Sequence, residues 1–186
     1  MKRRWFFLLV LLLLGLTAAW LWREARLEKK FVDQMLVAAT RYGVDPLLVK
    51  AIVWRESRFR PDARGSHGEI GLMQVQELAA REWADAERLG HFNHELCSDP
   101  GTNTMAGTFY LGKLLKRYAA TDNPLPYALA DYNAGRGNVL KWNTASARTN
   151  SVQFIAQIHF PATRAYVKSV MRRYALYRFL SRFGWA

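Results

Sequence analysis

Hydrophobic residues form one long continuous run near the N-terminus. From Trp5 to Trp22 every residue is apolar or small, and the first charge after it is Arg23. About 18 such residues just reach the length that a helix needs to cross the roughly 30 Å hydrocarbon core of a bilayer. Tryptophans lie at both ends of the run, as aromatic residues do at membrane interfaces, and the basic residues 2–4 precede it. The pattern predicts a membrane helix whose N-terminus faces the cytoplasm.

The same run allows a second interpretation, a signal peptide that is removed after export. Its apolar region would be Phe6–Leu16, followed by Thr17-Ala18-Ala19 as a small-residue cleavage site. We favour the anchor because the apolar run continues through Trp22. A lipoprotein is not expected, since no cysteine lies near the end of the run. Both interpretations place the rest of the chain outside the cytoplasm.

Beyond the run, apolar residues recur at helical spacing and no segment alternates as a strand does. Asp45-Pro46 and Asp99-Pro100 each combine an N-cap residue with proline at the first helical position. Gly43 is placed to end the helix before the first of these pairs. Expected helices cover residues 24–42, 47–55, 72–89, 100–115, 127–133, 152–158 and 161–180.

Between these helices, residues 123–126 and 139–142 are expected to form turns and residues 145–151 a loop. In the helix over 72–89, the predicted core contacts are Leu78, Trp83 and Leu89. About 160 residues follow the apolar run, enough for one domain with a hydrophobic core. We therefore expect an all-α fold in three parts: an anchor at 1–23, a juxtamembrane helix at 24–43 and the folded domain at 44–186.

Positive charge accumulates towards the C-terminus. The formal net charge is +12, and no acidic residue follows Asp131. The basic residues after it are Arg136, Lys141, Arg148, Arg164, Lys168, Arg172, Arg173, Arg178 and Arg182. This surplus indicates an anionic partner, either a cell-wall polymer, lipid headgroups or nucleic acid, and export argues against nucleic acid. We hypothesise that the basic C-terminal helix holds the domain against an anionic wall or membrane.

Cysteine and histidine offer no convincing metal site. Cys97 is the only cysteine, so it forms no intramolecular disulfide and is expected to be a small packed residue. His91 and His94 have the i, i+3 spacing that can suit a metal, but no third ligand accompanies them. A G-x-S-x-G nucleophile motif is also absent from the sequence. We therefore expect neither a metal nor a cofactor.

Glu56 is the best candidate for chemistry. It ends an apolar helical segment and precedes a glycine-rich loop that leads to a second apolar turn, Gly71-Leu72-Met73-Gln74. An apolar setting raises the pKa of a carboxyl group towards neutrality, as a general acid requires, and the negative end of a helix dipole acts in the same direction. The alternative is a solvated or ion-paired glutamate, since three arginines lie close in sequence: Arg55, Arg58 and Arg60.

Four short motifs in order carry a resemblance to a known family. They are Glu56-Ser57 after the apolar helix, Gly71-Leu72-Met73-Gln74, Tyr132-Asn133-Ala134-Gly135 and Thr163-Arg164-x-Tyr166-Val167. Asp99-Pro100, Asn103, Gly107 and Tyr110-Leu111 match the central helix of the same family. The sequence from Val44 to Tyr177 thus resembles the SLT-type lytic transglycosylases, lysozyme-like enzymes that cut bacterial peptidoglycan. The resemblance implies a lysozyme-like helical domain.

The resemblance also implies a mechanism without metal, cofactor or consumed water. Glu56 would protonate the oxygen that bridges N-acetylmuramic acid and N-acetylglucosamine. The same carboxylate would then take the proton of the muramoyl C6 hydroxyl, which closes on C1 to give a 1,6-anhydro end. By the same resemblance, the substrate-binding residues would be Ser57, Ser66, Met73, Gln74, Tyr132, Asn133 and Tyr166.

Two departures from the family pattern bear on substrate preference. Gln76 stands where the family often has a substrate-contacting methionine, and Ala162 where a glutamate commonly precedes Thr-Arg. The predicted protein is a single-pass protein of the bacterial inner membrane, with its catalytic domain facing the periplasm and binding glycan strands but no nucleic acid. Two alternatives remain open, a non-catalytic peptidoglycan-binding scaffold and a hydrolase of the same fold. The hydrolase would use a second carboxylate from among Asp62, Glu69 and Asp131.

Overall fold

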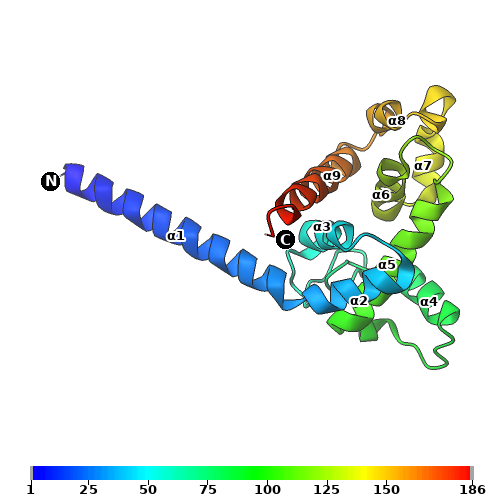
Figure 1. Cartoon of the computed structure of the whole chain (residues 1–186), viewed down its shortest axis with the longest axis horizontal. Helices are drawn as coiled ribbons and strands as arrows, with labels where there is room; N and C mark the ends of the chain where they lie inside the picture. Colours follow the sequence, from blue (N-terminus) through cyan, green and yellow to red (C-terminus); the bar gives the residue numbers. More distant parts are fainter. Residues whose placement is uncertain (1, 185–186) are drawn as a thin grey trace.

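A computed structural model describes residues 2–184, which form nine α-helices and two 3₁₀ helices (Figure 1). The α-helices are α1 (Lys2–Lys30), α2 (Val32–Tyr42), α3 (Pro46–Ser57), α4 (Glu77–Ala86), α5 (Pro100–Arg117), α6 (Pro124–Ala134), α7 (Arg136–Trp142), α8 (Ser151–Gln157) and α9 (Pro161–Ser181). The 3₁₀ helices are η1 (His94–Ser98) and η2 (Ala145–Arg148). Within the described residues the only extended pairing is two isolated bridges, Arg64 with Ile70 and Ile70 with Val75. The expected all-α class is confirmed.

Helix α1 extends away from the folded domain as a single straight element (Figure 1). Among the described residues it is the one helix long and apolar enough to cross a membrane, with none of its apolar window buried in the protein. The sequence predicted a new helix from residue 24, but α1 continues to Lys30 and the break falls at Phe31. The backbone of Phe31 is not helical (ψ 18°), and its side chain is buried in the core. The chain therefore changes direction at the residue whose ring packs into the domain.

The end of α1 is attached to the domain by side-chain contacts. Glu28 pairs with Lys50 of α3 at 2.9 Å, and the Lys50 ammonium lies 4.7 Å from the ring centre of Tyr177 on α9. Leu27 packs against the core beside them. Because the ion pair is largely shielded from water, it is less screened than a surface pair. Side-chain contacts therefore join the end of α1 directly to α3 and α9.

Helix α3 lies at the centre of the domain, between α9 on one side and α2 on the other (Figure 1). It begins as the sequence predicted: the Asp45 side chain accepts a hydrogen bond from the Leu47 amide, and Pro46 occupies the first turn. Val49, Ile52 and Val53 are fully buried, and burial of each such side chain stabilises the fold by about 1.5–3 kcal/mol. Packing on both sides fixes the end of α3, where Glu56 lies.

Two predicted boundaries were wrong for identifiable reasons. Residues 124–126 are the first turn of α6, since Asn123 caps the Leu125 amide and Pro124 occupies a position that needs no amide hydrogen. The expected turn at 139–142 belongs to α7.

The helix predicted over 72–89 begins only at Glu77. Gln74 adopts a left-handed conformation (φ 47°) and Ile70 pairs with Val75, so residues 72–76 form a turn. Trp83 is buried as predicted, but Leu78 is 82% exposed and Leu89 is also exposed, so the core assignment of these two leucines was wrong.

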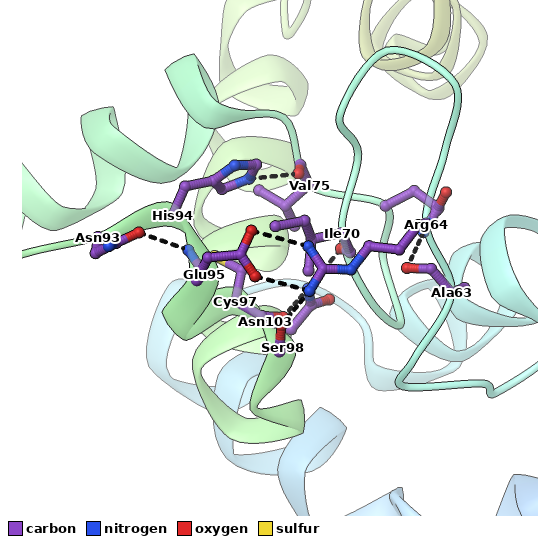
Figure 2. A network of polar contacts seen from close by, with 11 residues as sticks. Ala63, Arg64, Ile70, Val75, Asn93, His94, Glu95, Cys97, Ser98 and Asn103 are labelled. Atoms are coloured by element: carbon purple, nitrogen blue, oxygen red, sulfur yellow. Dashed lines mark hydrogen bonds and ion pairs between the residues drawn. The ribbon is translucent and has the colours of Figure 1, made fainter.

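A buried asparagine holds the loop between α3 and α4. Asn103 of α5 accepts a hydrogen bond from the Met73 amide at 2.8 Å. It also donates to the carbonyls of Ile70 and Cys97 at 2.7 and 2.8 Å (Figure 2). Gly71 is required at this crossing, because a Cβ there would lie 2.4 Å from Asn103 Nδ2 and the backbone is left-handed (φ 76°). The Asn103 side chain therefore holds the main chain of the loop against α5.

Exposed contacts complete this attachment. Figure 2 shows Arg64 donating to both carboxylate oxygens of Glu95, at 3.0 and 2.7 Å, and to the Ser98 hydroxyl. His94 Nε2 lies 2.9 Å from the Val75 carbonyl oxygen, on the same side of the loop. Cys97, predicted to be a packed residue, is fully buried, and burial raises the pKa of its thiol to about 12. Helix η1 thus supports the loop along its outer edge.

Replacing Asn103 with alanine is expected to lower the free energy of unfolding by about 3 kcal/mol, because a buried amide and two buried carbonyls lose their partner. Urea unfolding of the detergent-solubilised chain measures this value. The matched control is Asn93→Ala, which removes the exposed cap of η1 and should cost about 1 kcal/mol. Equal losses in the two variants would contradict the proposed role of Asn103.

Candidate active site

A cleft of about 420 Å³ opens beside the C-terminal end of α3. One wall comes from the loop between α3 and α4, and the opposite wall from the end of α6. Its lining includes Glu56, Ser66, Glu69, Gln74, Gln76, Leu78, Gly107, Tyr110, Tyr132 and Asn133. The cleft therefore collects residues from distant parts of the sequence around one glutamate.

Glu56 receives a short hydrogen bond from a residue far along the chain. The Tyr166 hydroxyl of α9 donates to Glu56 Oε1 at 2.6 Å, across 110 positions of sequence. Tyr166 is buried, and the Arg55 guanidinium lies 5.3 Å from the centre of its ring. The carboxyl group is thereby held in one position at the foot of the cleft.

The pKa of Glu56 is raised to about 7. Burial is the main cause, because it removes water that would stabilise the carboxylate. The Tyr166 hydrogen bond and the positive charge of Arg55 lower the pKa in part, while the negative charge of Glu69 raises it further. A carboxyl group with this pKa can both donate and accept a proton near neutral pH.

Two tyrosines surround Glu56 as neutral hydrogen-bond donors. Burial, together with the negative charge of Glu56, raises the pKa of Tyr132 and of Tyr166 well above the ordinary value. The Tyr132 hydroxyl donates to the Met73 carbonyl at 2.8 Å, and its ring packs at a tilt against Tyr110, with 5.8 Å between ring centres. Tyr132 thus joins the two walls of the cleft and presents its ring to the opening.

Glu69 is a second carboxylate in the same cleft. Burial alone would raise its pKa, but hydrogen bonds from its own amide, the His67 amide and the Gln76 side chain hold the pKa below the ordinary value. Glu69 is therefore anionic at neutral pH, whereas the pKa of Glu56 lies near neutrality. The cleft contains one proton donor and one fixed negative charge.

The other two acidic candidates have different surroundings. Asp131 borders the cleft, but Arg117 and the Tyr118 hydroxyl bind its Oδ2 at 2.6 and 2.7 Å, and the side chain is buried. Asp62 lies on the exposed part of the loop, outside the cleft lining. Of the three carboxylates that a hydrolase might use, Glu69 is the one that the structure brings to Glu56.

Five of the predicted site residues line the cleft, namely Glu56, Ser66, Gln74, Tyr132 and Asn133. Tyr166 lies behind Glu56 and reaches it through its hydroxyl. Gln74 donates from its side-chain amide to the carbonyls of Ala63 and Gly71, so it shapes the loop as well as bordering the cleft.

Two of the predicted substrate-binding residues, Ser57 and Met73, are buried. The Ser57 hydroxyl donates to the Leu72 carbonyl at 2.8 Å and lies within hydrogen-bonding distance of the Val53 carbonyl, so it fastens the loop to α3. Met73 is fully buried against α5, where a Cβ on Gly107 would lie 2.6 Å from its sulfur. Both residues build the wall of the cleft from behind and do not reach its surface.

The departure at Gln76 falls directly on the cleft, where this side chain hydrogen-bonds Glu69. Ala162 lies on the exposed first turn of α9, outside the lining. The sequence assigned no site role to Leu78 or Tyr110. The sequence placed Leu78 in the core, because apolar residues at helical spacing give the same sequence pattern whether they face a core or a binding cleft.

Comparison with known proteins identifies the domain. The family model described as the transglycosylase SLT domain matches residues 33–155. The soluble lytic murein transglycosylase of Escherichia coli is 33% identical over 131 residues, which are 69% of this chain and 20% of that protein. The membrane-bound lytic murein transglycosylase F of Desulfosudis oleivorans is 37% identical over 105 residues, covering 55% of this chain and 21% of that protein.

Solved structures agree with the sequence matches. The 70 kDa soluble lytic transglycosylase of Escherichia coli superposes with a TM-score of 0.71 at 29% identity, covering 80% of this chain and 24% of that chain. An inactive mutant of the Slt lytic transglycosylase of Pseudomonas aeruginosa gives a TM-score of 0.70 at 27% identity, covering 78% of this chain and 23% of that chain. The chain spans about a fifth to a quarter of the length of these relatives. Its helical domain has the lysozyme-like SLT fold, and the chain belongs to the transglycosylase SLT domain family.

Proposed function

We propose that this protein is a peptidoglycan lytic transglycosylase. It would cleave the β-1,4 bond between N-acetylmuramic acid and N-acetylglucosamine and leave a 1,6-anhydro end. The observation that carries the proposal is Glu56, a carboxyl group with a pKa of about 7 at the foot of an open cleft. The relatives named lytic murein transglycosylases support the same activity.

The proposed reaction uses Glu56 twice. Because Tyr166 donates to Oε1, the proton of the neutral acid is carried by Oε2. Oε2 gives that proton to the bridging oxygen as the bond to C1 breaks, which leaves a carboxylate and a positively charged sugar ring. The carboxylate then accepts the proton of the C6 hydroxyl while that oxygen bonds to C1. Glu56 ends in its starting form, and no water is consumed.

Neighbouring groups support each half of this cycle. The Tyr166 hydrogen bond stabilises the carboxylate formed after the first proton transfer. The anionic Glu69 raises the pKa of Glu56 before the reaction and stabilises the positive charge that develops at C1. Ser66, Gln74 and Asn133 are the polar groups at the cleft surface that can position the sugars.

The membrane location is a further part of the proposal. We infer that α1 crosses the bacterial inner membrane once, with residues 1–23 as the anchor, 24–43 as the juxtamembrane segment and the domain at 44–186 in the periplasm. Support comes from the exposed apolar surface of α1 and from the basic residues that precede it. Since α1 continues to Lys30 before the break at Phe31, a helix and not a flexible loop leads into the domain.

Hydrolysis is the second candidate activity, because hydrolytic glycosidases use two carboxyl groups and Glu69 lies in the same cleft as Glu56. The product decides between the two. Mass spectrometry of muropeptides from purified sacculi is expected to show anhydro-muramoyl ends after digestion by the wild-type protein. Reducing muramoyl ends would assign the activity to a hydrolase.

Glu56→Gln is expected to reduce turnover of sacculi by about a thousandfold or more, because the amide neither donates nor accepts the required proton. The substitution should not lower the free energy of unfolding. Because the pKa of Glu56 is raised on folding, the wild-type fold becomes less stable as pH rises through about 7 and this group loses its proton. The Glu56→Gln variant has no such group, so it should melt at a higher temperature than wild type in mildly alkaline buffer. Full turnover in this variant would remove Glu56 from the catalytic role. Absence of turnover in both proteins, with unchanged binding to sacculi, would favour a non-catalytic binding or scaffold protein.

Two variants should move the pH dependence in opposite directions. Activity requires protonated Glu56, so kcat/KM falls as pH rises through its pKa. Tyr166→Phe removes a hydrogen bond that lowers this pKa, and the alkaline limb should shift to higher pH. Glu69→Gln removes a negative charge that raises it, and the limb should shift to lower pH. Shifts of the same sign in both variants would contradict the assignment of Glu56 as the acid.

A further inference from the structure

The C-terminal half of α9 exposes an apolar stripe that the domain does not cover. Leu176 and Phe179 of α9, and Phe183 in the turn directly after it, occur at spacings of three and four and are 43%, 55% and 62% exposed. The two phenylalanine rings contact each other edge to face, with 5.2 Å between their centres. On the other side of the same helix, Val170 and Tyr177 are buried in the core. This end of α9 is therefore apolar both towards the core and towards the outside.

Arginines flank the exposed stripe. Arg172, Arg178 and Arg182 are all exposed, and α9 contains no acidic residue. Aromatic and aliphatic side chains bordered by arginines are typical of helices that lie in a bilayer interface. The apolar groups enter the acyl boundary, and the guanidinium groups remain at anionic headgroups. A hydrated polysaccharide would use the arginines but would leave three large apolar side chains without a partner.

The stripe lies next to the point where α1 leaves the domain. Gly184, just after α9, borders the same groove of about 680 Å³ as Ala25, Glu28 and Lys29 of α1. In Figure 1 the C-terminal end of α9 lies on the side of the domain where α1 joins it. Ala25 is three residues beyond Trp22, which is about 5 Å along a helix and within the headgroup layer if Trp22 marks the interface.

The attachment of α1 keeps this arrangement together. Lys50 of α3 pairs with Glu28 of α1 and also lies over the ring of Tyr177, which is in the C-terminal half of α9. On another side of α1, Trp20 and Arg23 border a small groove with Arg60 of the loop that follows Glu56. The surface around α1 therefore includes both the end of α9 and the segment next to the catalytic helix.

From these observations we infer a second membrane contact, made by the C-terminal half of α9. Leu176, Phe179 and Phe183 insert into the interface of the bilayer that α1 crosses, and the flanking arginines bind anionic lipid headgroups. The inference rests on the membrane crossing of α1 proposed above. Two contacts, one through α1 and one through α9, fix the height and orientation of the cleft above the membrane. The accessible substrate is then the glycan that lies close to the bilayer surface.

Site-directed fluorescence on the full chain in lipid vesicles tests this contact. An environment-sensitive probe is attached to Phe183→Cys and, as the control, to Val152→Cys on α8, where the side chain is 75% exposed. The native Cys97 is fully buried in the folded protein, which shields it from the labelling reagent. In vesicles containing phosphatidylglycerol, the probe at 183 should shift to shorter wavelength and be quenched several-fold more by nitroxide lipids than the probe at 152.

Charge reversal tests the arginines separately. Arg178→Glu combined with Arg182→Glu should reduce quenching at 183 towards the level at 152. The matched control, Lys141→Glu with Arg148→Glu, makes the same charge change at exposed positions elsewhere and should leave quenching unchanged. Replacing phosphatidylglycerol with phosphatidylcholine should act like the first pair of substitutions, because the headgroups lose their net negative charge.

Membrane insertion of α1 is measured independently, as retention of the chain in vesicles after alkaline carbonate extraction. If the chain is retained but the probe at 183 is as accessible to water as the probe at 152, the second contact is overturned and the α1 anchor stands. Protection of the probe only after sacculi are added would also overturn it and would assign the stripe to the cell wall. Loss of the chain during extraction would overturn both the anchor and this inference.

Discussion

The hydrogen bond between Tyr166 and Glu56 is the contact on which the site depends. It joins α9 to the end of α3, and it lies where burial has already made the carboxylate unfavourable. These two effects oppose each other, and their balance leaves the pKa of Glu56 at about 7. With burial alone the pKa would be higher still, and with the hydrogen bond in open solvent it would fall to that of an ordinary acid. The reaction proposed for this protein needs the value between them, since one group must first give and then take a proton.

The cleft keeps this balance because its wall is rigid. The loop after α3 has no sheet or helix of its own. Asn103 forms two hydrogen bonds with its main chain, at Met73 and Ile70, and a third with the Cys97 carbonyl of η1. Ser57 fastens the same loop from the side of α3, and Tyr132 fastens it from the side of α6. A loop held from three directions can present Gln74 and Glu69 at fixed positions. It also excludes water from one side of Glu56.

Packed side-chain contacts also fix the junction between α1 and the domain. The ion pair between Glu28 and Lys50 and the contact of Lys50 with Tyr177 connect α1 to the two helices that carry Glu56 and Tyr166. The placement of the cleft relative to α1 is therefore set by packed contacts and not by a flexible linker. A stripe of apolar residues with arginines on α9 continues this surface next to α1.

The sequence by itself determined the helical class, the caps that begin α3 and α5, the apolar run of α1 and the candidacy of Glu56. These features depend on local rules, because periodicity and capping act over a few residues. The family resemblance added most of the cleft residues.

Only the tertiary structure decided that Ser57 and Met73 are buried behind the wall, that Leu78 faces the cleft and that Glu69 is the carboxylate beside Glu56. The pKa of Glu56 also depends on the tertiary structure, since it is set by burial and by a tyrosine 110 positions away. Spacing within a segment shows which side of a helix a residue occupies, but which surface covers that side is a property of the packed chain.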